Sequence, residues 1–366
     1  MVRPSFVFLI GIWLISPVVK GQYVALQTIC ELPDTLFESS GITYSAPGKF
    51  FSHNDSGDLP RIFEVDTTGN IIRVINLASA TAYDYEDITR DREGNVYVGD
   101  FGNNFNNRTN LCIYKIPFAE LSKDTAIPQV INFTYSDQLQ FPPLPAAQNF
   151  DCEAFFFYND SLYLFSKNWS NSDYTKMYRL PATPGNYIAM LTDSFKTNGW
   201  ITSACMNPSA TAFVLLSESQ IWLYNGFKNY NFTHSLITSF MIDSSQKEGI
   251  TFINDTAVYI TDEGVPGAAG NLYYLSLGKW IPHLTGHNNL DVVIHYNPSP
   301  HTITWMLSGS DSYDVELFDV QGKLVDTMSF STSRVRYDYS RRQAGLLLMR
   351  VTSREGNQKV EKMLFY

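Results

Sequence analysis

The sequence predicts an all-β protein, a five-bladed β-propeller followed by a small β-sandwich. Three observations carry this prediction. Tyr and Phe number 22 and 25 among 366 residues, and 44% of the chain is hydrophobic, which favours strands around a large core. Gly and Pro interrupt the chain often, and long windows with the apolar period of a helix are hard to find. A strand–turn–strand pattern also recurs along the chain.

The recurring pattern is a strand, a tight turn and a second strand that ends in polar residues. A third apolar run follows each copy, and a fourth follows most. The copies are SSGITYSAPGKFFSHND (39–55), YEDITRDREGNVYVGDF (85–101), CEAFFFYNDSLYLFSKN (152–168), TSACMNPSATAFVLLSES (202–219) and KEGITFINDTAVYITDEG (247–264). Four strands at a period near 50 residues are typical of a propeller blade.

The fifth copy lacks its fourth strand. The apolar run YVALQTICEL (23–32) is spare, so we expect it to pair at the outer edge of the last blade and close the ring. The alternative is a six-bladed propeller, with a divergent blade in the 67-residue interval between Glu86 and Glu153. The Pro-rich stretch FPPLPAAQNF in that interval reads instead as a loop.

The domain organisation follows from the two ends of the chain. Residues 1–21 have a basic residue, an apolar run and small residues, the pattern of a secretory signal peptide that is too short to span a membrane. Residues 22–287 form the propeller and 288–366 the C-terminal domain. The four cysteines fall in strand-like runs without metal-binding spacing, which favours buried thiols over disulfides.

Charge is unevenly distributed. Residues 22–287 carry 15 Lys and Arg against 27 Asp and Glu, whereas residues 288–366 are balanced. An acidic propeller argues against a nucleic-acid polymer or an anionic membrane as its partner. It is compatible with binding a cation.

One polar residue occupies the same place in the first strand of every copy. These residues are Ser40, Glu86, Glu153, Ser203 and Glu248. The first strand of a blade is innermost, so the five side chains are expected to ring the central tunnel. Carboxylates crowded there repel one another unless they are protonated or neutralised, and Glu and Ser oxygens suit Ca²⁺. A water-filled polar tunnel is the alternative. Strand alternation directs Asp87 away from the axis.

The pieces SSGI, YEDI, CEAF, TSAC and KEGI resemble the inner strands of the calcium-dependent apyrase family. The resemblance implies a five-bladed propeller with a central Ca²⁺ held by Ser and Glu at matching positions. It covers the inner strands alone and implies nothing about the substrate.

A second group of residues is expected at the tunnel mouth where the inner strands begin. Aromatic and charged side chains around a concave mouth suit a small-molecule, glycan or protein ligand. The candidates are Asn54, Asp55, Arg61, Asp100, Arg108, Lys167, Trp169, Glu218 and Asp262. The mouth could equally be an ordinary set of polar loops. No established catalytic motif is present, and hydrolysis would use a metal-oriented water with Asp55, Asp100 or Glu86 as base.

The C-terminal 288–366 segment resembles the type A sorting domain of the type IX secretion system of Bacteroidetes. The resemblance rests on YNPSP (296–300), VELFDVQGKLV (315–325), AGLLLMRV (344–351) and the terminal KMLFY. It implies handling by that secretion machinery and a secreted or cell-surface location. Two functions compete for the propeller: a ligand- or partner-binding module with a structural calcium ion, and an apyrase-like phosphohydrolase.

Overall fold

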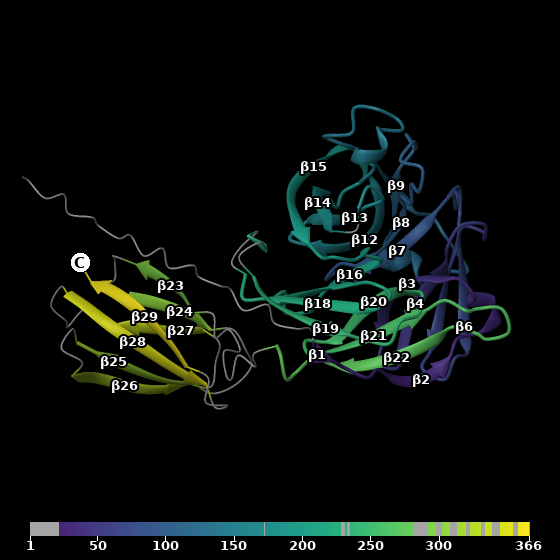
Figure 1. Cartoon of the computed structure of the whole chain (residues 1–366). Helices are drawn as coiled ribbons and strands as arrows, with labels where there is room; N and C mark the ends of the chain where they lie inside the picture. The colour runs from purple at the N-terminus through teal and green to yellow at the C-terminus, as the bar shows by residue number, and fades with distance from the viewer. Residues whose placement is uncertain are drawn as a thin grey trace, which may run out of the picture. The chain divides into compact units, whose positions relative to one another are not determined.

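The computed structural model of the chain divides into two compact units, Met1–Ile281 and Pro282–Tyr366 (Figure 1). It describes residues 22–171, 173–227, 231–232, 235–281, 292–297, 302–307, 313–319, 323–330, 334–338, 345–353 and 358–365. The predicted signal peptide, 1–21, lies outside them. Within these residues the only helices are short 3₁₀ turns at Asp34–Leu36, Phe118–Glu120 and Pro145–Ala147, which confirms the all-β prediction. None of the described helices could span a membrane.

The strands of the first unit form five antiparallel groups of four, each in the order expected from the repeats. The first three groups are β3 (Ser39–Ala46), β4 (Lys49–Asn54), β5 (Arg61–Asp66) and β6 (Ile71–Leu77); β7 (Tyr85–Arg90), β8 (Val96–Asp100), β9 (Cys112–Ile116) and β11 (Gln129–Tyr135); and β12 (Asp151–Tyr158), β13 (Ser161–Lys167), β14 (Tyr174–Pro181) and β15 (Gly185–Lys196). The last two are β16 (Ser203–Met206), β17 (Ala212–Leu216), β18 (Gln220–Asn225) and β19 (Leu236–Met241); and β20 (Lys247–Asn254), β21 (Ala257–Asp262) and β22 (Asn271–Ser276) with β2 (Gln27–Glu31).

The N-terminal strand completes the fifth group. β2 pairs antiparallel with β22, with Gln27 opposite Tyr274, which confirms the closure expected from the spare apolar run. The other groups are paired at their outer edges as well. β1 (Gln22–Tyr23) runs parallel to β19, β10 (Thr125–Ala126) runs parallel to β6, and β11 runs parallel to β15. The last pairing joins two groups into one eight-stranded sheet.

The innermost strands form a closed ring, because β3, β7, β12, β16 and β20 contact one another in that order and β20 returns to β3. The apolar core lies between neighbouring groups. Ile62 of the first group packs with Ile88 of the second, and Leu272 of the fifth packs with Ile42 of the first. The inner strands come very close: a Cβ on Gly41 would lie 2.9 Å from the backbone nitrogen of Ile88. The sheets therefore surround one axis, as in a propeller.

Four inner strands carry an irregularity at the same place. Their pairing shifts between Ser39 and Gly41, between Tyr85 and Ile88, between Cys152 and Ala154, and between Lys247 and Gly249. Ser40, Glu86, Glu153 and Glu248 lie at these bulges. A bulge bends its strand and redirects a side chain, so these four repeats orient the polar residue at this position in the same way, whereas β16 pairs regularly at Ser203.

All four cysteines are free thiols, and Cys112 and Cys152 are buried. The prediction of buried thiols therefore holds for these two, whereas Cys30 and Cys205 are thiols that are only partly buried. Burial raises the pKa of Cys112 to about 11, which favours the protonated thiol.

The second unit contains two antiparallel sheets, as a sandwich requires. One has three strands and the other has four. Val315 and Leu317 on one strand of the larger sheet alternate with more exposed neighbours and are fully buried. The sheets consist of β23 (Val292–Asn297), β24 (Thr302–Leu307) and β27 (Arg334–Asp338), and of β25 (Tyr313–Phe318), β26 (Leu324–Phe330), β28 (Gly345–Ser353) and β29 (Gln358–Phe365).

Candidate metal centre at the propeller axis

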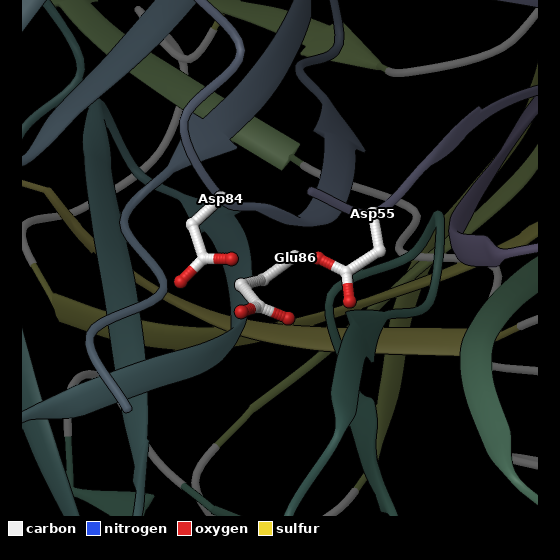
Figure 2. A group of neighbouring side chains, drawn as sticks. All are labelled: Asp55, Asp84 and Glu86. Carbon is white, nitrogen blue, oxygen red and sulfur yellow. The ribbon is translucent and has the colours of Figure 1, made fainter. Parts of the chain in front are cut away.

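Five carboxylates gather where the inner strands begin. Oxygens of Glu86, Asp151 and Glu153 all lie within 4.8 Å of one another, and so do oxygens of Asp55, Asp84 and Glu86. Figure 2 shows the second set, with the three carboxylates directed toward a common space. Two oxygens bound to one calcium ion at about 2.4 Å can be no more than about 4.8 Å apart. Both sets therefore have the compactness of a calcium site.

Glu86 belongs to both sets and is the residue that best fits a bound cation. Its side chain is only 5% exposed, yet among the described residues no hydrogen bond or ion pair reaches its carboxylate. Burial raises the pKa of Glu86 well above its ordinary value, and the charges of Glu153 and Asp55 raise it further. An ionised carboxylate in this place requires a positive charge beside it. A cation with hard oxygen ligands would supply that charge.

Lys167 already brings one positive charge to the cluster. It ends β13, and its Nζ lies 3.1 Å from Oε1 of Glu153. Burial lowers the pKa of Lys167, but the charges of Glu153, Glu248 and Glu86 outweigh burial and raise it. The ammonium group therefore stays charged and offsets part of the repulsion among the carboxylates.

Asp151 and Asp84 are held differently. Oδ2 of Asp151 accepts a hydrogen bond of 2.6 Å from Nε1 of Trp169, and another oxygen accepts one from the backbone of Asn103. Asp84 is half-buried, and burial together with the charges of Asp55 and Asp151 raises its pKa to about 7.

The backbone beside the cluster leaves no space to spare. A Cβ on Gly102 would lie 2.1 Å from Oε1 of Glu86 and 2.5 Å from Oδ2 of Asp84. A side chain at this position would collide with both carboxylates. Gly102 therefore allows the chain after β8 to form one wall of the cluster.

The structure brings together only part of the predicted ring. Glu86 and Glu153 share the acidic cluster. Glu248 lies outside it; burial raises the pKa of Glu248 to about 8, although the charge of Lys167 acts in the opposite direction. The two serines bond within the protein. Oγ of Ser40 donates to the backbone oxygen of Glu86 at 2.9 Å, and Oγ of Ser203 donates to Oδ1 of Asp87 at 3.0 Å.

Asp87 corrects an expectation. Alternation was expected to direct it away from the axis, but it is fully buried among the inner strands. Its carboxylate accepts hydrogen bonds from the backbone of Ile88, Phe155 and Ala204 and from Ser203. The bulge between Tyr85 and Ile88 breaks strict alternation, so adjacent acids both face inward. Asp87 ties three inner strands together.

The predicted mouth residues fall into two classes. Asp55, Lys167 and Trp169 adjoin the acidic cluster, as described above. The others form local contacts or lie apart. Asn54 bonds to Asp58, and Arg61 pairs with Asp58 at 2.7 Å. Arg108 pairs with buried Asp100 at 2.8 Å, Asp262 accepts hydrogen bonds from Ser245 and Tyr273, and Glu218 is exposed. The mouth therefore has one chemical centre at the axis.

Sequence reasoning missed Asp84 and Asp151, although a signal was present. Each lies two residues before a ring glutamate, in the tripeptides Asp84-Tyr85-Glu86 and Asp151-Cys152-Glu153. Residues two apart on a strand share a face. The repeated Asp-x-Glu pattern thus indicates paired carboxylates on two adjacent blades.

Two tryptophans lie beside the cluster, because Trp169 bonds to Asp151 and packs against Trp200. The ring centroids of Trp169 and Trp200 are 4.8 Å apart, and both rings are more than a third exposed. Nζ of Lys167 lies 5.5 Å from the first ring and 5.9 Å from the second. Exposed aromatic faces beside fixed charges are suited to a ligand that stacks and forms hydrogen bonds.

Comparison with known proteins identifies the C-terminal part of the chain. Residues 294–365 match the family described as a secretion system C-terminal sorting domain, which confirms that predicted resemblance. A sorting tail implies a secreted or cell-surface protein. None of the curated proteins matches the chain.

The chain is also similar to solved structures, at low levels of identity. PorZ, a surface component of the type IX secretion system of Porphyromonas gingivalis, is 11% identical with a TM-score of 0.34, over 89% of this chain and 44% of PorZ. A gluconolactonase from Xanthomonas campestris is 13% identical with a TM-score of 0.40, over 67% of this chain and 74% of that enzyme. This chain thus spans less than half the length of PorZ.

Proposed function

We propose that this protein is an exported or cell-surface binding module, a five-bladed propeller with a calcium ion at its axis and a ligand site at the adjoining mouth. The buried, unpaired carboxylate of Glu86 supports this proposal most directly, because it is shared by two compact sets of oxygen ligands. We interpret the five four-stranded groups as five blades. Glu86, Asp151 and Glu153 would hold the ion, with Asp55 and Asp84 on the side of the solvent.

The calcium ion would connect the axis to the mouth. Trp169 donates a hydrogen bond to Asp151, so an ion bound by Asp151 lies one side chain away from the exposed tryptophan pair. A ligand stacked on Trp169 and Trp200 could reach the ion with an oxygen atom. Calcium would then both stabilise the ring and orient the ligand.

Glu86→Gln tests the metal centre. The substitution keeps the size of the side chain and removes one charge, so calcium affinity measured by calorimetry should fall about tenfold or more. In calcium at a hundred times its Kd, the unsubstituted protein should gain about 2.7 kcal/mol in the free energy of unfolding relative to EDTA. Asp124→Asn is the matched control, because Asp124 is exposed and distant from the axis.

A water-filled tunnel predicts the opposite sign. Without a bound cation, Glu86→Gln relieves repulsion and should leave stability unchanged or raise it. A variant that binds calcium as tightly as the unsubstituted protein, and melts no lower in calcium, would falsify the metal centre.

Asp84 favours a second candidate function, an apyrase-like hydrolase of phosphate esters. It is a half-buried carboxylate on the solvent side of the cluster, where it could accept a proton from an attacking water. A screen of nucleoside diphosphates and simple phosphate esters, with calcium and with EDTA, separates the two functions. Calcium-dependent phosphate release that Asp84→Asn abolishes would establish the hydrolase. A protein that binds calcium tightly but releases no phosphate supports the binding module.

A further inference from the structure

A cavity of about 340 Å³ lies at the end of the axis opposite the acidic cluster. It is surrounded by the distal parts of the inner strands, where Tyr44, Arg90, Phe157, Met206 and Phe252 line its wall. Asp87 and the strands that it joins lie between this cavity and the acidic cluster along the same strands. The two sites are therefore chemically separate.

Hydroxyl groups recur around this cavity because the repeats recur. Thr43, Thr89 and Thr251 follow Ser40, Glu86 and Glu248 by three residues, and all three are at least 95% buried. Oγ1 of Thr251 accepts a hydrogen bond from the backbone of Tyr44. Within the described part of the chain, the hydroxyls of Thr43 and Thr89 have no hydrogen-bond partner. Both residues line the cavity, so their hydroxyls are available to a ligand.

The positive charge of the cavity comes from two arginines. Nη1 of Arg90 donates to the backbone oxygens of Tyr44 and Ser45 at 2.8 and 3.3 Å, which fixes the guanidinium in the wall. Its other N–H groups meet no acceptor among the described residues. Arg92 is exposed at the rim.

The nearest acid does not neutralise these arginines by direct contact. Asp91 also lines the cavity, but its oxygens accept hydrogen bonds from the backbone of Glu93 and Asn95, from Nδ2 of Asn95 and from the hydroxyl of Tyr97. The donors that remain open in the cavity therefore favour an anion.

We propose that this cavity is a second binding site, which takes a small organic carboxylate with an apolar body. A planar carboxylate matches the fork of the Arg90 guanidinium. The apolar body would lie against Phe157, Met206 and Phe252, with Thr89 donating to a carboxylate oxygen. Binding here is independent of calcium, because no part of the acidic cluster lines the cavity.

Titration of the full chain with benzoate, followed by calorimetry, tests this site. Benzamide is the matched neutral probe, and inorganic phosphate is the anion without an apolar body. Benzoate should bind at least about tenfold more tightly than either probe. EDTA should leave the benzoate affinity unchanged.

Substitutions locate the binding. Arg90→Gln should weaken benzoate at least about tenfold, and Arg92→Gln, at the exposed rim, about two- to fivefold. Arg73→Gln is the control, because Arg73 pairs with Glu64 on outer strands and should leave benzoate affinity unchanged. Should Arg90→Gln fail to fold, Arg92→Gln and the probe series still decide.

Three results overturn the proposal. They are equal affinities for benzoate and benzamide, phosphate binding as tight as benzoate binding, and a benzoate affinity that both arginine substitutions leave unchanged. Absence of any benzoate binding to folded protein overturns it as well. Because the readout does not involve calcium, failure here leaves the metal centre at the other end of the axis untouched.

Discussion

Asp87 shows how one residue can join several strands. Four donors from three inner strands converge on its carboxylate. Burial raises the pKa of Asp87, and these hydrogen bonds act in the opposite direction. The sequence pattern could not reveal this role, since a one-residue bulge reverses the face that alternation assigns.

His53 leads to a prediction about pH. It is fully buried, its Nδ1 bonds to the backbone oxygen of Asn54, and its Nε2 has no partner. Burial lowers its pKa from 6.5 to about 4. Between pH 6.5 and pH 4 the His53 side chain is protonated in the unfolded chain but neutral in the folded chain. The contribution of neutral His53 to the free energy of unfolding is therefore complete above pH 6.5 and is lost as the pH falls toward 4.

We expect the free energy of unfolding of the unsubstituted protein, relative to His53→Gln, to fall by up to about 3 kcal/mol between about pH 7 and pH 4. Urea unfolding at both pH values measures it, and groups common to both proteins cancel. Asn132→Ala, a substitution on the surface that changes no titratable group, should show a constant difference when compared in the same way. A constant difference for His53→Gln as well would mean that His53 is protonated as readily in the fold as in the unfolded chain.

The candidate site was predictable only in part. Glu86 and Glu153 follow from their repeated place in the inner strands. The position of Lys167 was also expected at the mouth, but its ion pair with Glu153 was not. A strand pattern specifies which residues face the axis. It does not specify which charged partner a long side chain such as that of Lys167 will reach.

At the scale of elements, β2 is the piece whose placement follows most directly from the sequence. The sequence has an apolar run without a partner before the first repeat, and its last repeat has only three strands. The spare run supplies the missing fourth strand. The parallel pairing of β11 with β15 was not predicted. It depends on how neighbouring blades meet at their outer edges, and repeat patterns describe each blade by itself.

Removing β2 should weaken the ring at its point of closure. A chain that begins at Leu32 leaves the edge of β22 unpaired, so we expect its melting temperature to fall by at least about 5 °C and its exposed edge to promote association. Calorimetric melting and size-exclusion chromatography measure both effects. A chain that begins at Leu26 lacks only β1 and is the control. Identical behaviour of the two shortened chains would contradict a closing role for β2.

For the whole molecule, the two compact units differ in charge as well as in fold. The propeller carries the acidic excess, and the sorting tail is balanced. Because each unit has its own strands and sheets, we expect residues 22–281 to fold without the tail. They should retain the β signal in circular dichroism and the calcium affinity of the full chain. Insoluble protein without that signal would refute independent folding.

The strand pairings at the outer edges hold neighbouring blades together. β6, β11, β19 and β22 each hold a strand from elsewhere in the chain, so the blades are tied at the circumference as well as at the axis. Splaying any blade outward would have to break hydrogen bonds far from the centre. We therefore expect the outer pairings to help fix the spacing of the axial carboxylates, and with it the size of the ion proposed to bind there.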